Sequence, residues 1–317
     1  MAALANIRHV ERERLRGLLL PGHLVQVSGP PMVGKLTVVN QVLRDMGSAS
    51  RLQDSLSRTP HAGPFIQHRF SCQSAAGGLS VLANMAAKLE RPLHGWEDLN
   101  SATAAVLGDL RAAVLLADQG RGAPCHHIFV FEKCEALVTR DADFWFLGFL
   151  SALMRALASH LVTVVFTSYK RFQWSGGDGG GFPGNRDRLV TGPVQDGDGH
   201  VCWTLEIGQL MDIDILSLLQ HFAPAVNPSP YLYIFQRFLG FPEAVRKVAQ
   251  TFLLGTTVGA ALSSASLETV VKTDYAFLHS VFSSRLGEVM DWVGWENLLL
   301  LRHFGNSLDS SATMGTV

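Results

Sequence analysis

The segment VQVSGPPMVGKLTVV, residues 25–39, constrains the fold of this chain more than any other stretch. Its apolar start is typical of a buried parallel strand, its Gly/Pro centre of a tight loop, and its Gly-Lys pair of a helix start. Phosphate-binding loops have this arrangement, because glycines let successive backbone N–H groups face a phosphate while a lysine neutralises its charge. The segment therefore predicts a loop that binds a phosphorylated ligand.

The loop departs from the pattern G-x-x-x-x-G-K-[ST] at its magnesium ligand. Leu36 occupies the hydroxyl position, and Met32 replaces a glycine that is common in such loops. Thr37 comes one residue late, so on a helix it points about 100° away from the required direction. The residues that we predict to bind the phosphates are Gly29, Pro30, Pro31, Met32, Val33, Gly34, Lys35, Leu36 and Thr37.

A hydrolytic site would also need carboxylates at the end of a second buried strand, within HIFVFEKCEAL, residues 127–137. Glu132 is the candidate catalytic residue, but Lys133 follows it where a second carboxylate would be expected. The sequence therefore does not favour Mg²⁺ binding or fast hydrolysis. No other metal is predicted, because the nearby cysteines and histidines flank or enter a predicted strand and cannot easily converge on zinc.

The remaining chain alternates between short apolar runs and longer amphipathic stretches as far as about residue 207. This alternation predicts a three-layer α/β domain with a parallel sheet. The predicted strands are residues 23–29, 65–72, 128–131, 161–168 and 203–207, and the predicted helices are residues 8–20, 36–46, 80–90, 100–119 and 144–160. Residues 51–64 and the Gly/Asp-rich residues 173–200 are predicted loops, and helices predominate after residue 209.

Composition excludes several classes of protein. The formal net charge is −1 with both signs scattered along the chain, so no nucleic-acid surface is predicted. Four widely spaced cysteines do not suggest a disulfide scaffold, and the N-terminus lacks the features of a secretory signal. The longest uncharged apolar run, residues 144–154, is too short to span a membrane and is predicted to be a buried helix. We expect a soluble, cytoplasmic protein.

Five segments, taken in order over residues 10–254, resemble motifs of the NB-ARC/STAND class of P-loop NTPases, which is related to the AAA+ ATPases. VERERLRGLL resembles the segment that precedes the first strand in that class, with Glu11 in place of a glycine before Arg12. The loop segment VQVSGPPMVGKLTVV resembles the Walker A motif, and HIFVFEKCEAL resembles the Walker B motif. LVTVVFTSYKRF resembles the sensor-1 strand, matching at Thr167 and Ser168 but carrying Tyr169 at the arginine position.

The last two resemblances lie beyond the predicted sheet. LEIGQLMDIDILSLLQHFAP resembles the entry into a helical lid, and FLGFPEAVRKVAQTF resembles a Gly-x-Pro motif whose proline, here Pro242, packs near a bound adenine. The resemblance implies a P-loop nucleotide-binding α/β domain over residues 1–207, a helical lid over 208–257, and a helical segment over 258–317 that could be an incomplete winged helix.

The resemblance further implies a switch that binds ADP or ATP, with Arg12 near the adenine and with protein partners in signalling, such as innate defence or cell death, or in self-association. Three functions follow as hypotheses. The first is a nucleotide-binding switch or scaffold with weak or no ATP hydrolysis. The second is a pseudo-NTPase that binds only proteins. The third is an active ATPase in which Glu132 or Glu135 replaces the missing acids.

Overall fold

The chain divides into two compact units, which are considered separately. One comprises Arg8–Gly29 and Val33–Gly208, and the other comprises Met1–Ile7, Pro30–Met32 and Gln209–Val317. The structure, a computed structural model, describes residues 7–29, 33–56, 65–72, 77–90, 98–134, 137, 143–168, 190–195, 200–208, 210–222 and 242.

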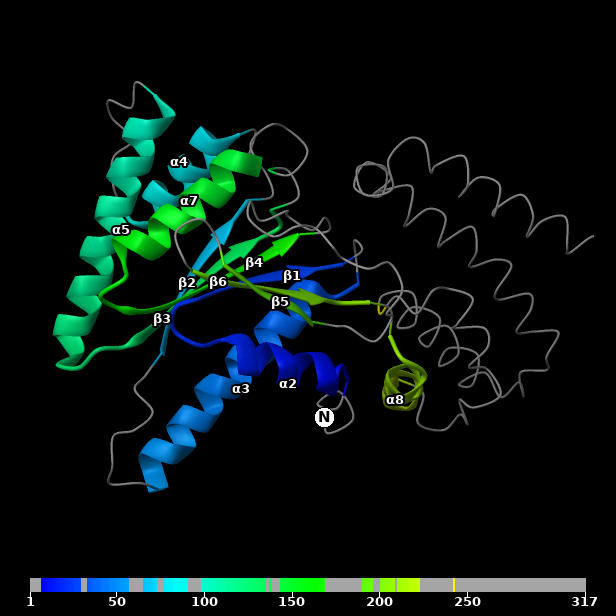
Figure 1. Cartoon of the computed structure of the whole chain (residues 1–317). Helices are drawn as coiled ribbons and strands as arrows, with labels where there is room; N and C mark the ends of the chain where they lie inside the picture. Colours follow the sequence, from blue (N-terminus) through cyan, green and yellow to red (C-terminus); the bar gives the residue numbers. More distant parts are fainter. Residues whose placement is uncertain are drawn as a thin grey trace, which may run out of the picture. The chain divides into compact units, whose positions relative to one another are not determined.

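The first unit is built on one six-stranded sheet (Figure 1). Its order is β2-β3-β4-β1-β6-β5, in which β5 pairs antiparallel with β6 and every other neighbouring pair is parallel. The central strand β1 therefore lies between β4 and β6, and β4 separates it from β3. The strands are β1 (His23–Ser28), β2 (Phe65–Ser71), β3 (His126–Glu132), β4 (Leu161–Ser168), β5 (Val190–Gln195) and β6 (Val201–Glu206).

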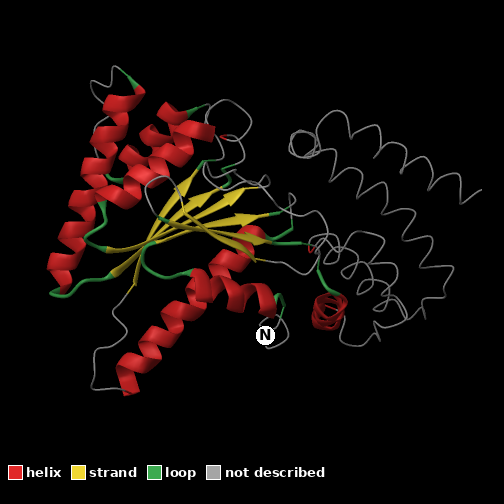
Figure 2. Ribbon diagram, viewed as in Figure 1, coloured by secondary structure: helices red, strands yellow, loops and turns green. Residues whose placement is uncertain are grey.

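Helices cover both faces of this sheet (Figure 2), which confirms the predicted three-layer α/β architecture. One layer holds α2 and α3, and the other holds α4, α5 and α7. The helices are α2 (His9–Leu18), α3 (Lys35–Leu56), α4 (Gly78–Lys88), α5 (Leu99–Arg121) and α7 (Asp143–Ala156). Of the second unit, the structure describes α8 (Asp212–Phe222) as a helix, as predicted for MDIDILSLLQHF.

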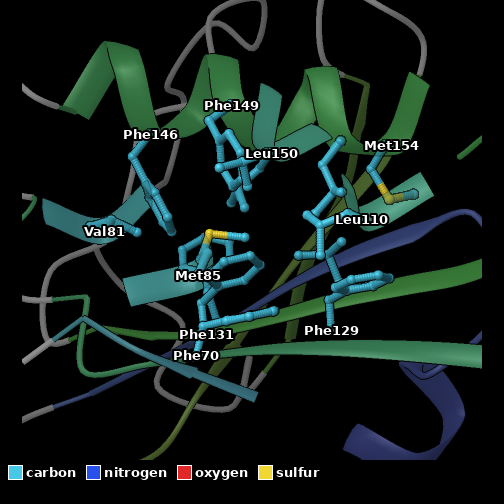
Figure 3. Close-up of a cluster of buried hydrophobic side chains, with 14 of the residues drawn as sticks. Phe70, Val81, Met85, Leu110, Phe129, Phe131, Phe146, Phe149, Leu150 and Met154 are labelled. Atoms are coloured by element: carbon cyan, nitrogen blue, oxygen red, sulfur yellow. The ribbon is translucent and has the colours of Figure 1, made fainter. Parts of the chain in front are cut away.

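Aromatic side chains join the sheet to the layer that contains α4, α5 and α7 (Figure 3). The fully buried ring of Phe131 on β3 meets Phe146 and Phe149 of α7 edge to face, with ring centroids 5.8 and 6.0 Å apart. Edge-to-face packing adds about 0.5–1.5 kcal/mol per pair to the burial of the rings. The apolar run at residues 144–154 therefore forms a core helix, as predicted.

Helix α5 combines a capped start and stop with one buried stripe. Asp98 accepts hydrogen bonds from the amides of Asn100 and Ser101 at 2.7 and 2.8 Å, and Gly122 ends the helix in the left-handed conformation. Within the described part of the chain, α5 is the one helix long and apolar enough to cross a membrane. Its residues Ala102, Val106, Leu110 and Val114 are buried against the domain at a spacing of four.

Two sequence predictions were wrong in detail. Helix α3 continues to Leu56, so residues 51–56 are helical where a loop was predicted. Strand β5 lies within residues 173–200, where the Gly and Pro residues predicted a loop; it pairs with β6 across a register shift. The other predicted helices after residue 222 fall outside the described residues.

A cluster of ionisable groups around the buried His127 lies at the opposite end of the sheet from the glycine loop. Asp118, near the end of α5, accepts hydrogen bonds from the Cys125 amide at 2.8 Å, from His127 Nε2 at 3.1 Å and from His160 Nδ1 at 3.0 Å. Burial raises the pKa of Asp118, but these hydrogen bonds outweigh it and lower the pKa to about 2. Asp118 therefore joins α5 to the starts of β3 and β4 as a carboxylate.

His68 extends this cluster onto β2. Its Nε2 lies 3.0 Å from His127 Nδ1, and its ring stacks on Phe129 with centroids 4.5 Å apart. Burial, together with the nearby charge of His127, lowers the pKa of His68 to about 4. Since its ordinary value is near 6.5, His68 is neutral in the folded chain at pH values where it is charged in the unfolded chain.

The lowered pKa of His68 predicts a pH-dependent stability. Between pH 6.5 and 4, His68 binds a proton in the unfolded chain but not in the folded chain. The contribution of neutral His68 to the free energy of unfolding is therefore fully present above pH 6.5 and is lost as the pH falls towards 4. We expect the free energy of unfolding, measured with denaturant, to fall over this window. The variant His68→Phe, which preserves stacking on Phe129, should flatten the fall.

The matched control is His9→Phe, because His9 is exposed at the start of α2. This control should leave the pH dependence as it is in the unchanged chain. A His68→Phe protein whose stability falls as steeply as that of the control would contradict the assignment of a neutral, half-buried His68.

Candidate functional site

The predicted phosphate loop lies at the carboxyl end of the central strand. After Ser28, Gly29 has φ +148° and Gly34 has φ +93°, conformations that suit glycine, and Lys35 then begins α3. Lys35 is only 7% exposed, and its Nζ donates a hydrogen bond to the Gly29 carbonyl oxygen at 2.8 Å. The lysine therefore lies across the loop, joining its last residue to its first.

The start of the loop packs closely against the backbone at the end of β6. The Ile207 amide donates to the Ser28 carbonyl oxygen at 2.7 Å, and a Cβ added at Gly29 would lie 2.1 Å from the Ile207 carbonyl oxygen. Only glycine fits there, because the atoms nearest to the added Cβ belong to the backbone carbonyl of Ile207 and cannot rotate away as a side chain would. Gly29 is thus required by its neighbour as well as by its φ angle.

The other residues of the loop differ in exposure. Val33 is fully buried, Leu36 is half-buried and Thr37 is exposed, so the hydroxyl of Thr37 does not lie in the interior next to Lys35. Pro30, Pro31 and Met32 lie outside the described residues. The structure thus brings together Gly29, Gly34 and Lys35 from the predicted set.

Glu132, the candidate catalytic residue, ends β3 next to a cation of the protein itself. Its Oε1 lies 3.5 Å from Nη1 of Arg69 on β2, and Arg69 Nη2 also donates to the amide oxygen of Asn40 on α3. The backbone then turns at Lys133, which has φ +59°. A divalent cation at Glu132 would have to displace Arg69 or share the carboxylate with it.

Thr167 and Ser168, the predicted sensor residues, make internal hydrogen bonds at the end of β4. The Thr167 hydroxyl accepts from the Lys133 amide at 2.9 Å, which holds the turn after β3. The buried Ser168 hydroxyl accepts from Gln26 Nε2 at 2.8 Å, and the Thr204 hydroxyl donates to Gln26 Oε1 at 3.3 Å. This polar bridge links β4, β1 and β6 directly below the loop.

The two residues predicted to lie near the adenine are placed differently from the loop residues. Arg12 on α2 forms an ion pair with Asp45 on α3, with Nη2 2.6 Å from Oδ2. Pro242 is half-buried in the second unit. Contact of Arg12 and Pro242 with the base stays a prediction.

The sequence interpretation did not identify Arg8, a buried side chain that makes several polar contacts next to the described part of the loop. Its Nη1 lies 2.7 Å from Glu11 Oε1, while its Nη2 donates to the carbonyl oxygens of Val33 at 3.0 Å and Gly208 at 2.7 Å. One signal for it was present, because Glu11 is in register with the buried Leu15 and Leu18 on α2. A carboxylate on a buried helix face needs a cationic or hydrogen-bonding partner.

Comparisons with known proteins give structural likeness only, since no family model and no curated protein matches the chain. The chain is similar to Orc1 of Aeropyrum pernix, solved in complex with DNA, with TM-score 0.49, 13% identity, and coverage of 83% of this chain and 64% of that one. A Walker-type ATPase of Pyrococcus abyssi gives TM-score 0.46 and 11% identity, covering 89% and 75%.

A STAND protein of Pyrococcus horikoshii with a tetratricopeptide repeat sensor gives TM-score 0.37 and 12% identity, covering 75% of this chain and 28% of that one. This chain thus spans less than two thirds of the length of Orc1 and of the STAND protein. With every one of these TM-scores below 0.5, the assignment of the site rests on the strand order and the loop geometry.

The contact between Gly29 and Ile207 predicts a severe effect of a small substitution. Gly29→Ala would place a Cβ against the Ile207 carbonyl oxygen in a backbone conformation that alanine rarely adopts. We expect the free energy of unfolding to fall by about 3 kcal/mol if the backbone relaxes partly, and by more if it does not. Denaturant unfolding followed by circular dichroism measures this.

Gly17→Ala is the matched control, because a Cβ at Gly17, inside α2, meets nothing within 4 Å. It should be neutral or stabilise the chain by up to about 1 kcal/mol. Equal stability of the two variants would contradict the packing of β6 on the loop.

Proposed function

We propose that the chain is a nucleotide-binding regulatory switch or scaffold that holds ADP or ATP and hydrolyses ATP slowly or not at all. The observation that carries this proposal is the buried Lys35, bonded across a loop that begins at Gly29 and contains Gly34, at the carboxyl end of the central strand. Ligands of parallel α/β sheets bind outside this edge of the sheet.

A diphosphate suits the chemistry of this edge. The first turn of the 22-residue helix α3 contains no acidic residue, so its N-terminal amides and dipole are free of a competing carboxylate. The ammonium group of Lys35 donates a hydrogen bond to the Gly29 carbonyl oxygen, which places a cation at the loop where a phosphate would bind. A charge-assisted hydrogen bond to phosphate is worth about twice a neutral one.

The features that support hydrolysis are weaker. Leu36 offers no hydroxyl to Mg²⁺, and the Glu132 carboxylate lies within ion-pair distance of Arg69. Lys133 follows Glu132 in a left-handed conformation where a second acid would be needed to polarise water. These three features favour retention of nucleotide over turnover.

The finer points of the proposal rest on the sequence resemblance to NB-ARC/STAND proteins. They are recognition of adenine by Arg12 and Pro242, a lid over residues 208–257, and protein partners in signalling or self-association. For Arg12 to contact a base, its ion pair with Asp45 would have to open or be shared.

Nucleotide binding through Lys35 gives the first functional prediction. Denaturing the purified protein should release ADP or ATP, identifiable by chromatography, in an amount close to one nucleotide per chain. Lys35→Ala removes a charged hydrogen bond worth about 1.5–3 kcal/mol, so the dissociation constant of ADP, measured by calorimetry, should rise about 10- to 100-fold.

Lys88→Ala serves as control, since Lys88 lies exposed at the end of α4, where its Nζ donates to the Arg69 carbonyl oxygen and not to a residue of the loop. It should bind ADP as the unchanged chain does. A purified protein that contains no nucleotide and ignores added ADP would replace this proposal with that of a pseudo-NTPase that binds only proteins.

Slow hydrolysis gives the second functional prediction. Any release of phosphate from ATP with Mg²⁺ present should be slow and should not change in Glu132→Gln, because the carboxylate faces Arg69. Glu206→Gln, at the end of β6 on the same edge of the sheet, is the control. Turnover that Glu132→Gln abolishes and Glu206→Gln preserves would establish an active ATPase instead.

A further inference from the structure

Arg8 lies where the chain passes between its two units. The chain enters the first unit at Arg8, re-enters it at Val33 after the loop, and leaves it after Gly208. The guanidinium group of Arg8 donates to the carbonyl oxygens of both Val33 and Gly208, at 3.0 and 2.7 Å. The side chain of Arg8, itself the first residue of this unit, is therefore bonded to two of the other residues at which the chain enters or leaves the unit, Val33 and Gly208.

A single nitrogen makes both carbonyl contacts. Nη2 of Arg8 carries two hydrogens, one for the Val33 oxygen and one for the Gly208 oxygen, so a displacement of either carbonyl disturbs the other bond. The second nitrogen, Nη1, is occupied by Glu11 at 2.7 Å. The group is thus bonded to the loop, to the exit of the chain and to α2 at the same time.

The cost of burying this pair indicates a role beyond simple stabilisation. The side chains of Arg8 and Glu11 are 3% and 4% exposed, and within the described part of the chain Glu11 Oε2 is buried without a hydrogen-bond partner. Buried ion pairs contribute little net stability compared with apolar packing, and their best-established use is to fix one arrangement.

We propose that Arg8 is a positioning residue that couples occupation of the phosphate loop to the backbone at Gly208, where the chain leaves the first unit. This inference rests on the proposed nucleotide binding. A phosphate bound at Gly34 and Lys35 constrains the adjacent Val33 carbonyl, and Arg8 transmits this constraint to Gly208. Arg8 does not contact the ligand, because its side chain is buried and fully engaged.

Lysine cannot replace this arginine, which gives a conservative test. Arg8→Lys keeps the charge next to Glu11, but a single ammonium on a flexible stem does not reproduce the planar fork that reaches both carbonyls. Arg16→Lys is the matched control: Arg16 lies on the same helix, is 41% exposed, and pairs with Glu13. Circular dichroism confirms that each variant is folded.

The experiment measures amide hydrogen exchange with and without ADP over residues 201–208, which include the Ile207 amide bonded to Ser28. In the unchanged chain and in Arg16→Lys, ADP should slow this exchange. In Arg8→Lys the slowing should be largely lost, and the affinity for ADP should fall by about fivefold or more, the lower end of typical coupling between sites.

The possible failures are distinguishable. If the unchanged chain binds no ADP, both the proposed function and the coupling are wrong. If it binds ADP but exchange over residues 201–208 does not change, the coupling is wrong and nucleotide binding stands, whether or not Arg8→Lys folds. An Arg8→Lys protein that accelerates exchange equally with and without ADP, at unchanged affinity, would show that Arg8 is only a structural anchor.

Discussion

The close approach of the backbones at the ends of β1 and β6 determines the arrangement of the whole loop edge. Because the Ile207 carbonyl oxygen occupies the space that a side chain at residue 29 would need, the chain leaves β1 through a glycine conformation. That exit places the Gly29 carbonyl oxygen within reach of Lys35 Nζ. The pairing of β1 with β6 thus brings the glycine and the lysine together at the edge of the sheet where ligands of parallel α/β folds bind.

The strands and most helices could be predicted from the sequence because burial imposes a pattern. β1, β3 and β4 are nearly continuous apolar runs, which a parallel strand covered on both faces requires. Strand β5, VTGPVQ, has no such pattern, because its pairing with β6 on the edge of the sheet supplies the hydrogen bonds that its own composition does not indicate.

The site separates in the same way into local and distant contributions. Gly29, Gly34 and Lys35 could be found by spacing, because a loop that presents backbone amides imposes its own short pattern. The pairs of Arg8 with Gly208 and of Arg69 with Glu132 join residues 200 and 63 positions apart, and no short pattern specifies them. For Arg8 the one local trace is Glu11, a carboxylate in register with Leu15 and Leu18.

The distribution of charge at this edge distinguishes between the ligands that the loop could attract. Lys35, Arg8 and Arg69 are all cationic, while the carboxylates of Glu11 and Glu132 each lie within ion-pair distance of one of these arginines. Mg²⁺ would add two positive charges to this edge, and both of these carboxylates already have an arginine as partner. A diphosphate brings negative charge to Lys35 and to the first amides of α3, where the helix dipole also favours it. If the proposed function is correct, electrostatics therefore favours a ligand held by its phosphate groups at Lys35 and at the first turn of α3 over a divalent cation held at Glu132.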